Sequence, residues 1–209
     1  MKWICKIAFY RNIRNETPNK ELAKELADTA NKDGIKEISE YLFDKNKSVS
    51  SDSLAVLYNI GYIKPELIQE YVEDFLKLLV SKNNRMVWGS MIALSTIATL
   101  KADCIFKKIG LILETMKNGT LITEVWGIKT LVKLSINKQK YKTKLLPVLI
   151  DYLEKCRPID FASRVETIIP VLKSSEDKEI LSTIIQKKTN ELSLSQTKKL
   201  KTILNKDGK

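Results

Sequence analysis

The sequence predicts an all-α fold, a right-handed α–α superhelix of about five stacked helical hairpins. Three observations support this prediction. A tripeptide recurs together with its apolar surroundings, apolar residues follow helical periodicity, and the residues that make tight turns are scarce. The 209 residues include only seven Gly and five Pro, whereas apolar residues make up 44%. That apolar fraction is sufficient for a folded core and too high for a disordered chain.

The internal repeat has a period of 38 residues. Val-Trp-Gly at 87–89 recurs as Val-Trp-Gly at 125–127, and the same offset places Val49 before them. Apolar positions fall mostly on apolar positions in four copies, at residues 54–56, 92–94, 130–132 and 168–170. A period of about 38 residues fits a helix–turn–helix unit that is copied along the chain.

Within each unit we expect two helices. Residues 86–100 are almost continuously apolar, which suits a helix packed on several sides, and the i, i+4, i+7 spacing over 105–116 indicates an amphipathic helix. Proline near a helix start (Pro18, Pro65) and Asn-rich or Gly-containing loops separate these runs. The expected hairpins cover 18–44, 49–81, 84–117, 120–156 and 159–191.

The remaining segments are expected to cap this array. Residues 2–14 are predicted to form an N-terminal helix that covers the first hairpin, and 194–205 a short polar C-terminal helix. The whole chain, 1–209, is therefore predicted to be a single repeat domain with about five repeats over 18–191. Pro147 and Pro170 lie inside expected helices and should kink them.

The charge is distributed unevenly. The net charge is +11; residues 1–104 carry 15 Lys and Arg against 14 Asp and Glu, and residues 105–209 carry 21 against 11. A basic half can attract nucleic acid, an anionic membrane or an acidic protein. Only five of the 36 basic residues are Arg, whereas sequence-reading nucleic-acid sites favour Arg. A compositional bias toward Lys, Ile and Asn, which requires no binding function, is the favoured explanation of the charge.

Several kinds of chemistry have no support in the sequence. It contains no His, which removes His-based acid–base catalysis and most catalytic zinc sites. The cysteines, Cys5, Cys104 and Cys156, are odd in number and widely spaced, so they indicate neither a disulfide framework nor a zinc site and favour a reducing cytoplasm. We expect no cofactor, no metal and no enzymatic activity.

No segment is long and apolar enough to predict a membrane span. The start of the chain, with Lys6 interrupting its apolar run, does not resemble a signal peptide. The apolar residues Trp3, Ile4, Ile7 and Tyr10 could touch a membrane weakly, but packing on the first hairpin is the simpler interpretation.

Two features are candidate binding surfaces. Trp88 and Trp126 occupy equivalent repeat positions, which favours a packing role over a platform for stacking a base or a peptide ring. The basic run 137–144, together with Lys107, Lys108, Lys129 and Lys133, could bind phosphates, or it could be a solvated loop and helix start.

The loop Asp44-Lys45-Asn46-Lys47-Ser48-Val49 resembles the inter-helix loop of HEAT repeats, in which an Asp precedes a Val-Arg pair. Arg85 and Arg164 lie near the expected Arg position, whereas Ser50, Trp88 and Trp126 follow or replace it. The Val-Trp-Gly units, the N-terminal stretch and the Lys-Asn-Asn-Arg loop are also similar to those of uncharacterised bacterial HEAT-repeat proteins. The resemblance covers roughly 18–191 and implies a HEAT or armadillo-like fold, a cytoplasmic location and no assigned chemistry.

The function predicted from these features is a non-enzymatic scaffold that binds a protein or peptide on a concave face, expected to be lined by the second helix of each hairpin. The alternative is a nucleic-acid-binding protein that uses the basic C-terminal half, possibly a DNA-alkylation-repair-like HEAT glycosylase, although no acid and aromatic residues match the site of such an enzyme. The candidate binding residues are Tyr71, Lys107, Lys108, Lys140, Lys144, Lys187 and Lys188.

Overall fold

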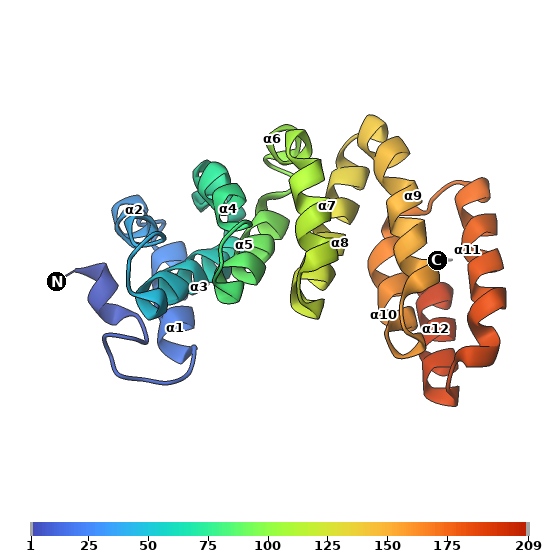
Figure 1. Ribbon diagram of the computed structural model, residues 1–209, viewed down its shortest axis with the longest axis horizontal. Coiled ribbons are helices and arrows are strands. Elements are labelled where there is room, and N and C mark those ends of the chain that lie inside the picture. The colour runs from blue at the N-terminus through green and yellow to red at the C-terminus, as the bar shows by residue number, and fades with distance from the viewer. Residues whose placement is uncertain (1, 208–209) are drawn as a thin grey trace. The chain divides into compact units, whose positions relative to one another are not determined.

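The computed structural model describes residues 2–207, and every regular element in this range is a helix (Figure 1). The predicted all-α fold is confirmed. The helices follow one another as five hairpins and a last helix, in the order that the 38-residue period predicts. The chain divides into two compact units, residues 1–130 (unit 1) and 131–209 (unit 2), a division that the prediction of one domain over 1–209 does not include. Helix α8, Leu121–Asn137, runs across the boundary.

Unit 1 contains two layers of helices (Figure 1). One layer consists of the first helices of the hairpins, α1 (Thr17–Asp28), α3 (Lys47–Ile63) and α5 (Asn84–Ile97). The other layer consists of second helices, α2 (Lys32–Glu40), α4 (Val72–Leu78), α6 (Ala102–Lys107) and α7 (Ile109–Asn118), with the short 3-10 helices η2 (Pro65–Leu67) and η3 (Gln69–Tyr71) before α4.

Asparagine side chains cap the N-termini of three helices of unit 1. The Asn31, Asn46 and Asn83 side chains accept hydrogen bonds from the backbone N–H groups of Gly34, Ser48 and Arg85. Each bond satisfies a donor in the first turn of its helix, which has no partner within the helix. The loops in which the sequence showed Asn-rich turns therefore fix where the helices begin.

The N-terminal segment differs from the expected helix over 2–14. It forms one short 3-10 helix, η1 (Trp3–Lys6), followed by turns, and Asn12 has a φ of 54°, in the left-handed region that ends helical structure. The N–H of Ala8 donates to Asn19 Oδ1 at 2.9 Å, and Ile4 and Ile7 are buried. The segment thus packs on the first hairpin.

Unit 2 contains α9 (Gln139–Lys155), α10 (Pro158–Ile168), α11 (Ser175–Lys188) and α12 (Leu194–Asp207), with the 3-10 helices η4 (Ile169–Val171) and η5 (Thr189–Glu191). Its buried side chains are mainly aliphatic, and the rings of Tyr141 and Phe161 are buried among them. Pro147 lies inside α9, whereas Pro170 lies in η4, directly after α10 has ended. Of the two expected kinks, the second is therefore a helix end, because Pro cannot donate the next helical hydrogen bond.

Candidate functional site

Small residues let the first helices of unit 1 approach one another closely. Helix α3 packs on α1 on one side and on α5 on the other. A Cβ atom on Gly89 would lie 2.7 Å from Leu54 Cδ2, and one on Gly61 would lie 2.3 Å from Thr96 Oγ1. Both distances are too short for a larger residue unless its neighbour moves, so at each glycine a side chain of one helix lies directly against the backbone of the other.

This close approach brings four aromatic rings together. The rings of Tyr58 and Trp88 have centroids 6.2 Å apart, those of Tyr58 and Tyr62 are 6.2 Å apart, and those of Tyr62 and Trp126 are 5.7 Å apart. These separations lie in the range of favourable ring pairs. We call these four residues, contributed by α3, α5 and α8, the aromatic surface.

The aromatic surface is partly open to solvent. Tyr62 is 49% exposed and both tryptophans are half-buried, whereas Tyr58 is only 5% exposed. Each indole packs against a tyrosine, as the packing interpretation expects, and still presents some surface to solvent. Tyr58 and Tyr62 were not among the residues selected from the sequence. Their spacing of four residues on one helix face was the available signal.

A lysine lies over one of the partly exposed rings of the aromatic surface. Lys129 Nζ is 3.7 Å from the centroid of the Trp126 ring, which is a cation–π contact. Burial lowers the pKa of Lys129 below its usual value. Among the described residues no carboxylate forms an ion pair with Lys129, so it offers a positive charge at the end of the aromatic surface.

The tyrosines keep their protons. The Tyr58 hydroxyl donates to Glu16 Oε1 at 3.4 Å. Burial, and secondly the charge of Glu16, raise the pKa of Tyr58 above its usual value and that of Tyr62 to about 12. Both phenols are therefore neutral hydrogen-bond donors at physiological pH.

At the other end of the aromatic surface a cavity of about 330 Å³ contains Arg14, Glu16, Asp52 and Arg85 in its lining. Its two acids have partners inside the protein. Asp52 accepts hydrogen bonds from the Phe9 N–H and the Asn19 side chain, and Glu16 accepts one from Tyr58. The Arg85 side chain is exposed and forms no ion pair within residues 2–207. Its guanidinium is thus available to an external acceptor.

The residues selected from the sequence do not gather in one place. In unit 1, Tyr71 ends η3 and is half-buried, and Lys107 and Lys108 are exposed between α6 and α7. They belong to the layer of second helices, opposite to the layer that carries the aromatic surface. As a site they remain a prediction.

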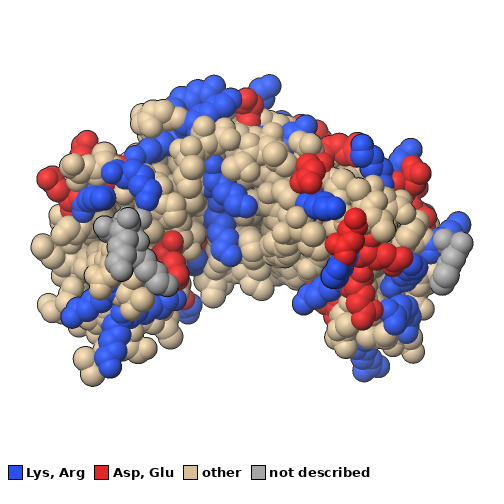
Figure 2. Space-filling view, turned by 180° about the vertical axis from the view of Figure 1, so that it is seen from behind, with Lys and Arg blue, Asp and Glu red and all other residues tan. Residues whose placement is uncertain are grey.

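In unit 2, Lys140 and Lys144 are exposed on α9 and Lys187 is exposed on α11. Lys188, which was expected to be exposed, is largely buried. Its side chain is 11% exposed, and its Nζ donates to the Cys156 carbonyl at 3.1 Å, so it fastens α11 to the end of α9. In the part of Figure 2 formed by the C-terminal half, on the left, Lys and Arg side chains form several separate groups.

The described part of the chain shows no metal site and no membrane span. No group of three His, Cys, Asp or Glu side chains within residues 2–207 could hold a metal ion. No helix in the same range has the length and apolarity needed to cross a bilayer.

Comparisons with known proteins identify the fold. No protein-family model and no curated protein matches the sequence. An engineered protein solved by a structural genomics consortium superposes with a TM-score of 0.65 at 15% identity, covering 100% of this chain and 97% of its own. A designed armadillo repeat protein in complex with the peptide (KR)4 gives 0.65 at 13% identity, covering 89% and 85%. A second engineered protein gives 0.62 at 15%, covering 99% and 58%.

These likenesses show the fold alone. The chain has a HEAT/armadillo-like helical-repeat fold.

Proposed function

We propose that the chain is a non-enzymatic interaction scaffold that binds an extended, acidic peptide segment of a partner protein on the aromatic surface of unit 1. The observation that carries this proposal is the unbroken contact of Tyr58, Tyr62, Trp88 and Trp126 across three helices. Exposed, rigid aromatic side chains provide a large contact area at low entropic cost and are enriched where proteins bind one another.

The charges next to these rings favour an acidic segment. The designed armadillo protein in the comparison is in complex with a basic peptide. Here Lys129 already covers Trp126, so a ligand cation would compete with Lys129 for the ring and be repelled by it. A ligand carboxylate would instead pair with Lys129 or Arg85, since the acids Glu16 and Asp52 already accept internal hydrogen bonds.

The proposed surface lies on the first helices of unit 1, whereas the sequence pattern predicts a binding face lined by the second helices. In unit 1 the first helices are the ones in extensive contact with one another, and they carry the aromatic residues.

Two labelled peptides test the proposal, (KR)4 and its charge-reversed counterpart (DE)4. Fluorescence anisotropy should show that (DE)4 binds and that (KR)4 binds at least about tenfold more weakly. Trp126→Ala should weaken (DE)4 binding about tenfold, because it removes both a ring and the anchor of Lys129. Tyr10→Ala, which truncates an exposed aromatic residue outside the aromatic surface, is the matched control and should change nothing.

Tighter binding of (KR)4 would contradict the acidic assignment. The nucleic-acid alternative is tested in the same assay with a labelled DNA duplex at two salt concentrations. Each neutralised phosphate contributes about 0.9 to the slope of log K against log salt. Steep, salt-sensitive duplex binding together with no (DE)4 binding would favour that alternative over the scaffold.

A further inference from the structure

Unit 2 repeats the two-layer arrangement, and α12 is the last of its helices within residues 2–207. Helices α10 and α12 lie side by side, since Gln196 Nε2 donates to the Ile159 carbonyl at 2.9 Å and Lys199 Nζ donates to Ser163 Oγ at 2.8 Å. These contacts join residues 37 and 36 positions apart, close to the repeat period. Helix α12 therefore takes the place of a first helix, next after α10.

The second helices α9 and α11 are joined in the same way. Lys142 Nζ lies 2.5 Å from Asp177 Oδ2, and Lys188 donates to the Cys156 carbonyl. Helix α10 thus has its second helix, α11. Helix α12 has none among residues 2–207, so the face of α11 directed away from α9 is left without a neighbouring second helix.

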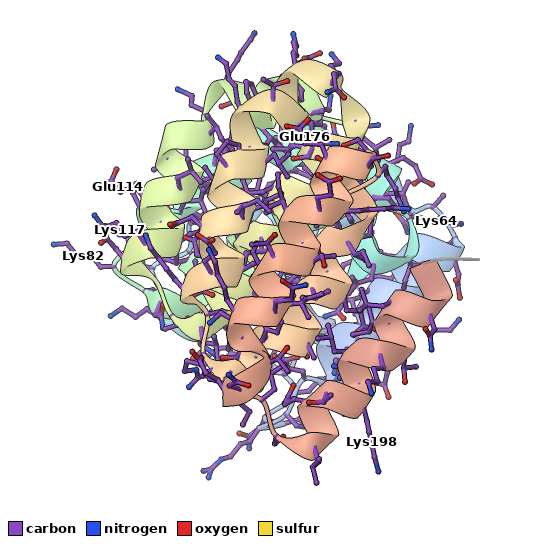
Figure 3. All side chains as sticks on the ribbon, turned by 90° about the vertical axis from the view of Figure 1, so that its right-hand side faces the viewer. Lys64, Lys82, Glu114, Lys117, Glu176 and Lys198 are labelled. Atoms are coloured by element: carbon purple, nitrogen blue, oxygen red, sulfur yellow. The ribbon has the colours of Figure 1, made fainter. Side chains whose placement is uncertain are left out.

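A groove occupies this position. It has a volume of about 310 Å³, its walls include Lys178, Leu181 and Ile185 of α11 and Leu204 of α12, and Ile169 and Leu172 form its floor. Leu172, Leu181 and Ile169 are buried, whereas Ile185 and Leu204 are half-buried. Figure 3 shows α11, with Glu176 labelled near its start, and α12, with Lys198 labelled.

The groove has the form of a helix-binding site. The residues that line it on α11 run from Lys178 to Gln186, about two helical turns or roughly 12 Å of helix. Ser182 lies between Lys178 and Gln186 on this face and has a small side chain, so it leaves a hollow between larger neighbours. Helices pack by placing a large side chain of one in such a hollow of the other.

The charges around the groove indicate the charge of the helix that it would bind. Unit 2 contains 17 Lys and Arg and nine Asp and Glu, a net charge of +8. Lys178 stands on the α11 wall, and Lys201, one turn before Leu204, stands on the same side of α12. Glu179 is exposed beside Lys178 at the outer edge. Cations on both walls, with one acid at the margin, favour an acidic ligand.

We infer that this groove binds an amphipathic, acidic helix of a partner protein, which takes the position of a second helix paired with α12. The partner contributes an apolar stripe at i, i+3 or i+4, and i+7 that fills the groove over Ser182, and carboxylates that meet Lys178 and Lys201. This surface is separate from the aromatic surface of unit 1, and the inference does not depend on the proposed function of that surface.

The probe for the experiment is a labelled synthetic helix of about 14 residues, with leucines at that spacing and glutamates beside them. Its control has lysines in place of the glutamates. In fluorescence anisotropy the acidic helix should bind at least about tenfold more tightly than the basic one. All three tryptophans lie in unit 1, so this binding should leave tryptophan emission unchanged, unlike (DE)4 binding to the aromatic surface.

Two variants of α11 locate the binding site without removing core atoms. Ser182→Glu puts a negative charge in the groove wall and should weaken binding of the acidic helix about tenfold. Thr183→Glu adds the same charge at an exposed position outside the groove lining and should leave binding unchanged. Circular dichroism verifies that both variants are folded.

Three results would overturn the inference. Equal binding of the acidic and basic helices would remove the charge assignment. Equal effects of Ser182→Glu and Thr183→Glu would remove the groove as the site. A concentration-dependent dimer in sedimentation that Ser182→Glu abolishes, with no binding of the acidic helix, would identify the occupant as a second copy of this chain.

Discussion

The two units hold their helices together by different interactions. In unit 1, glycine and other small residues let apolar surfaces of α3 and α5 meet directly, and its ion pairs lie at the surface. In unit 2, charged side chains fasten one helix to the next, with Lys142 on Asp177, Lys188 on the Cys156 carbonyl and Lys199 on Ser163. The same repeat architecture is thus stabilised mainly by shape in one unit and partly by charge in the other.

Because of this difference, the two units should respond differently to substitutions and to changes of pH. Close packing depends little on pH but is sensitive to added volume. A buried ion pair depends on the charge of both partners, because removal of one charge leaves the other buried without a counter-ion. Because tryptophan occurs only in unit 1, tryptophan emission follows the unfolding of that unit, whereas circular dichroism follows both.

The largest expected effect is that of Gly61→Val in unit 1. The new Cβ would lie 2.3 Å from Thr96 Oγ1 and 2.8 Å from Ile68 Cδ1, so Thr96 of α5 and Ile68 must move away from α3. We expect a loss of about 3 kcal/mol in the free energy of unfolding, measured by urea denaturation with tryptophan emission. Gly110→Ala is the control. A Cβ on Gly110 has no neighbour within 4 Å, and the change should stabilise α7 by about 0.5–1 kcal/mol.

The second effect is that of Asp177→Asn in unit 2. Asp177 is buried, accepts hydrogen bonds from Lys142 and from the N–H of Ser174, and completes the capping box of α11. The amide leaves the Lys142 charge without its counter-ion, so we expect unit 2 to lose about 2 kcal/mol, seen as a shift of the circular dichroism transition without a shift in tryptophan emission. An unchanged unfolding midpoint would show that this pair does not fasten α9 to α11.

Acidification should destabilise unit 2 by a smaller amount. Burial alone would raise the pKa of Asp177, but the hydrogen bonds from Lys142 and Ser174 outweigh it and lower that pKa below the usual value. A lowered pKa in the folded state means that the contribution is complete above pH 4 or so and is lost as the pH falls below it. Between pH 7 and pH 3, unit 2 of the parent chain should therefore lose more stability than unit 2 of Asp177→Asn.

Much of this fold was predictable because its repeat can be recognised in the sequence. The recurrence of Val-Trp-Gly and the apolar spacing depend on local helix formation and on contacts between neighbouring hairpins, which recur with the same period. The N-terminal segment was harder. Its apolar residues suggested a helix, but contacts of Ala8 with Asn19 and the left-handed Asn12, which are tertiary and turn effects, replace the helix with turns.

The candidate site was less predictable. The sequence marked Trp88 and Trp126 as equivalent positions, yet their contacts with Tyr58 and Tyr62 arise from helices far apart in the chain. Exposure of lysines was also difficult to predict. Lys187 and Lys188 are adjacent in α11, but only Lys188 turns toward Phe161 and the end of α9. A pattern along one helix does not show which of its charged residues meets a neighbouring element.

Lys129→Met should have the smallest effect on stability. It also separates the effect on stability from the effect on binding most clearly. The cation–π contact with Trp126 is partly exposed, so its loss should change the stability of unit 1 by only about 0.5 kcal/mol. Binding of (DE)4 should nevertheless weaken about tenfold, since the carboxylates lose a cation beside the aromatic surface. Lys117→Met removes the same charge from a side chain of α7 that projects outward (Figure 3) and should leave both measurements unchanged. A loss of binding in both variants would mean that net charge, and not the position of Lys129, attracts the acidic peptide.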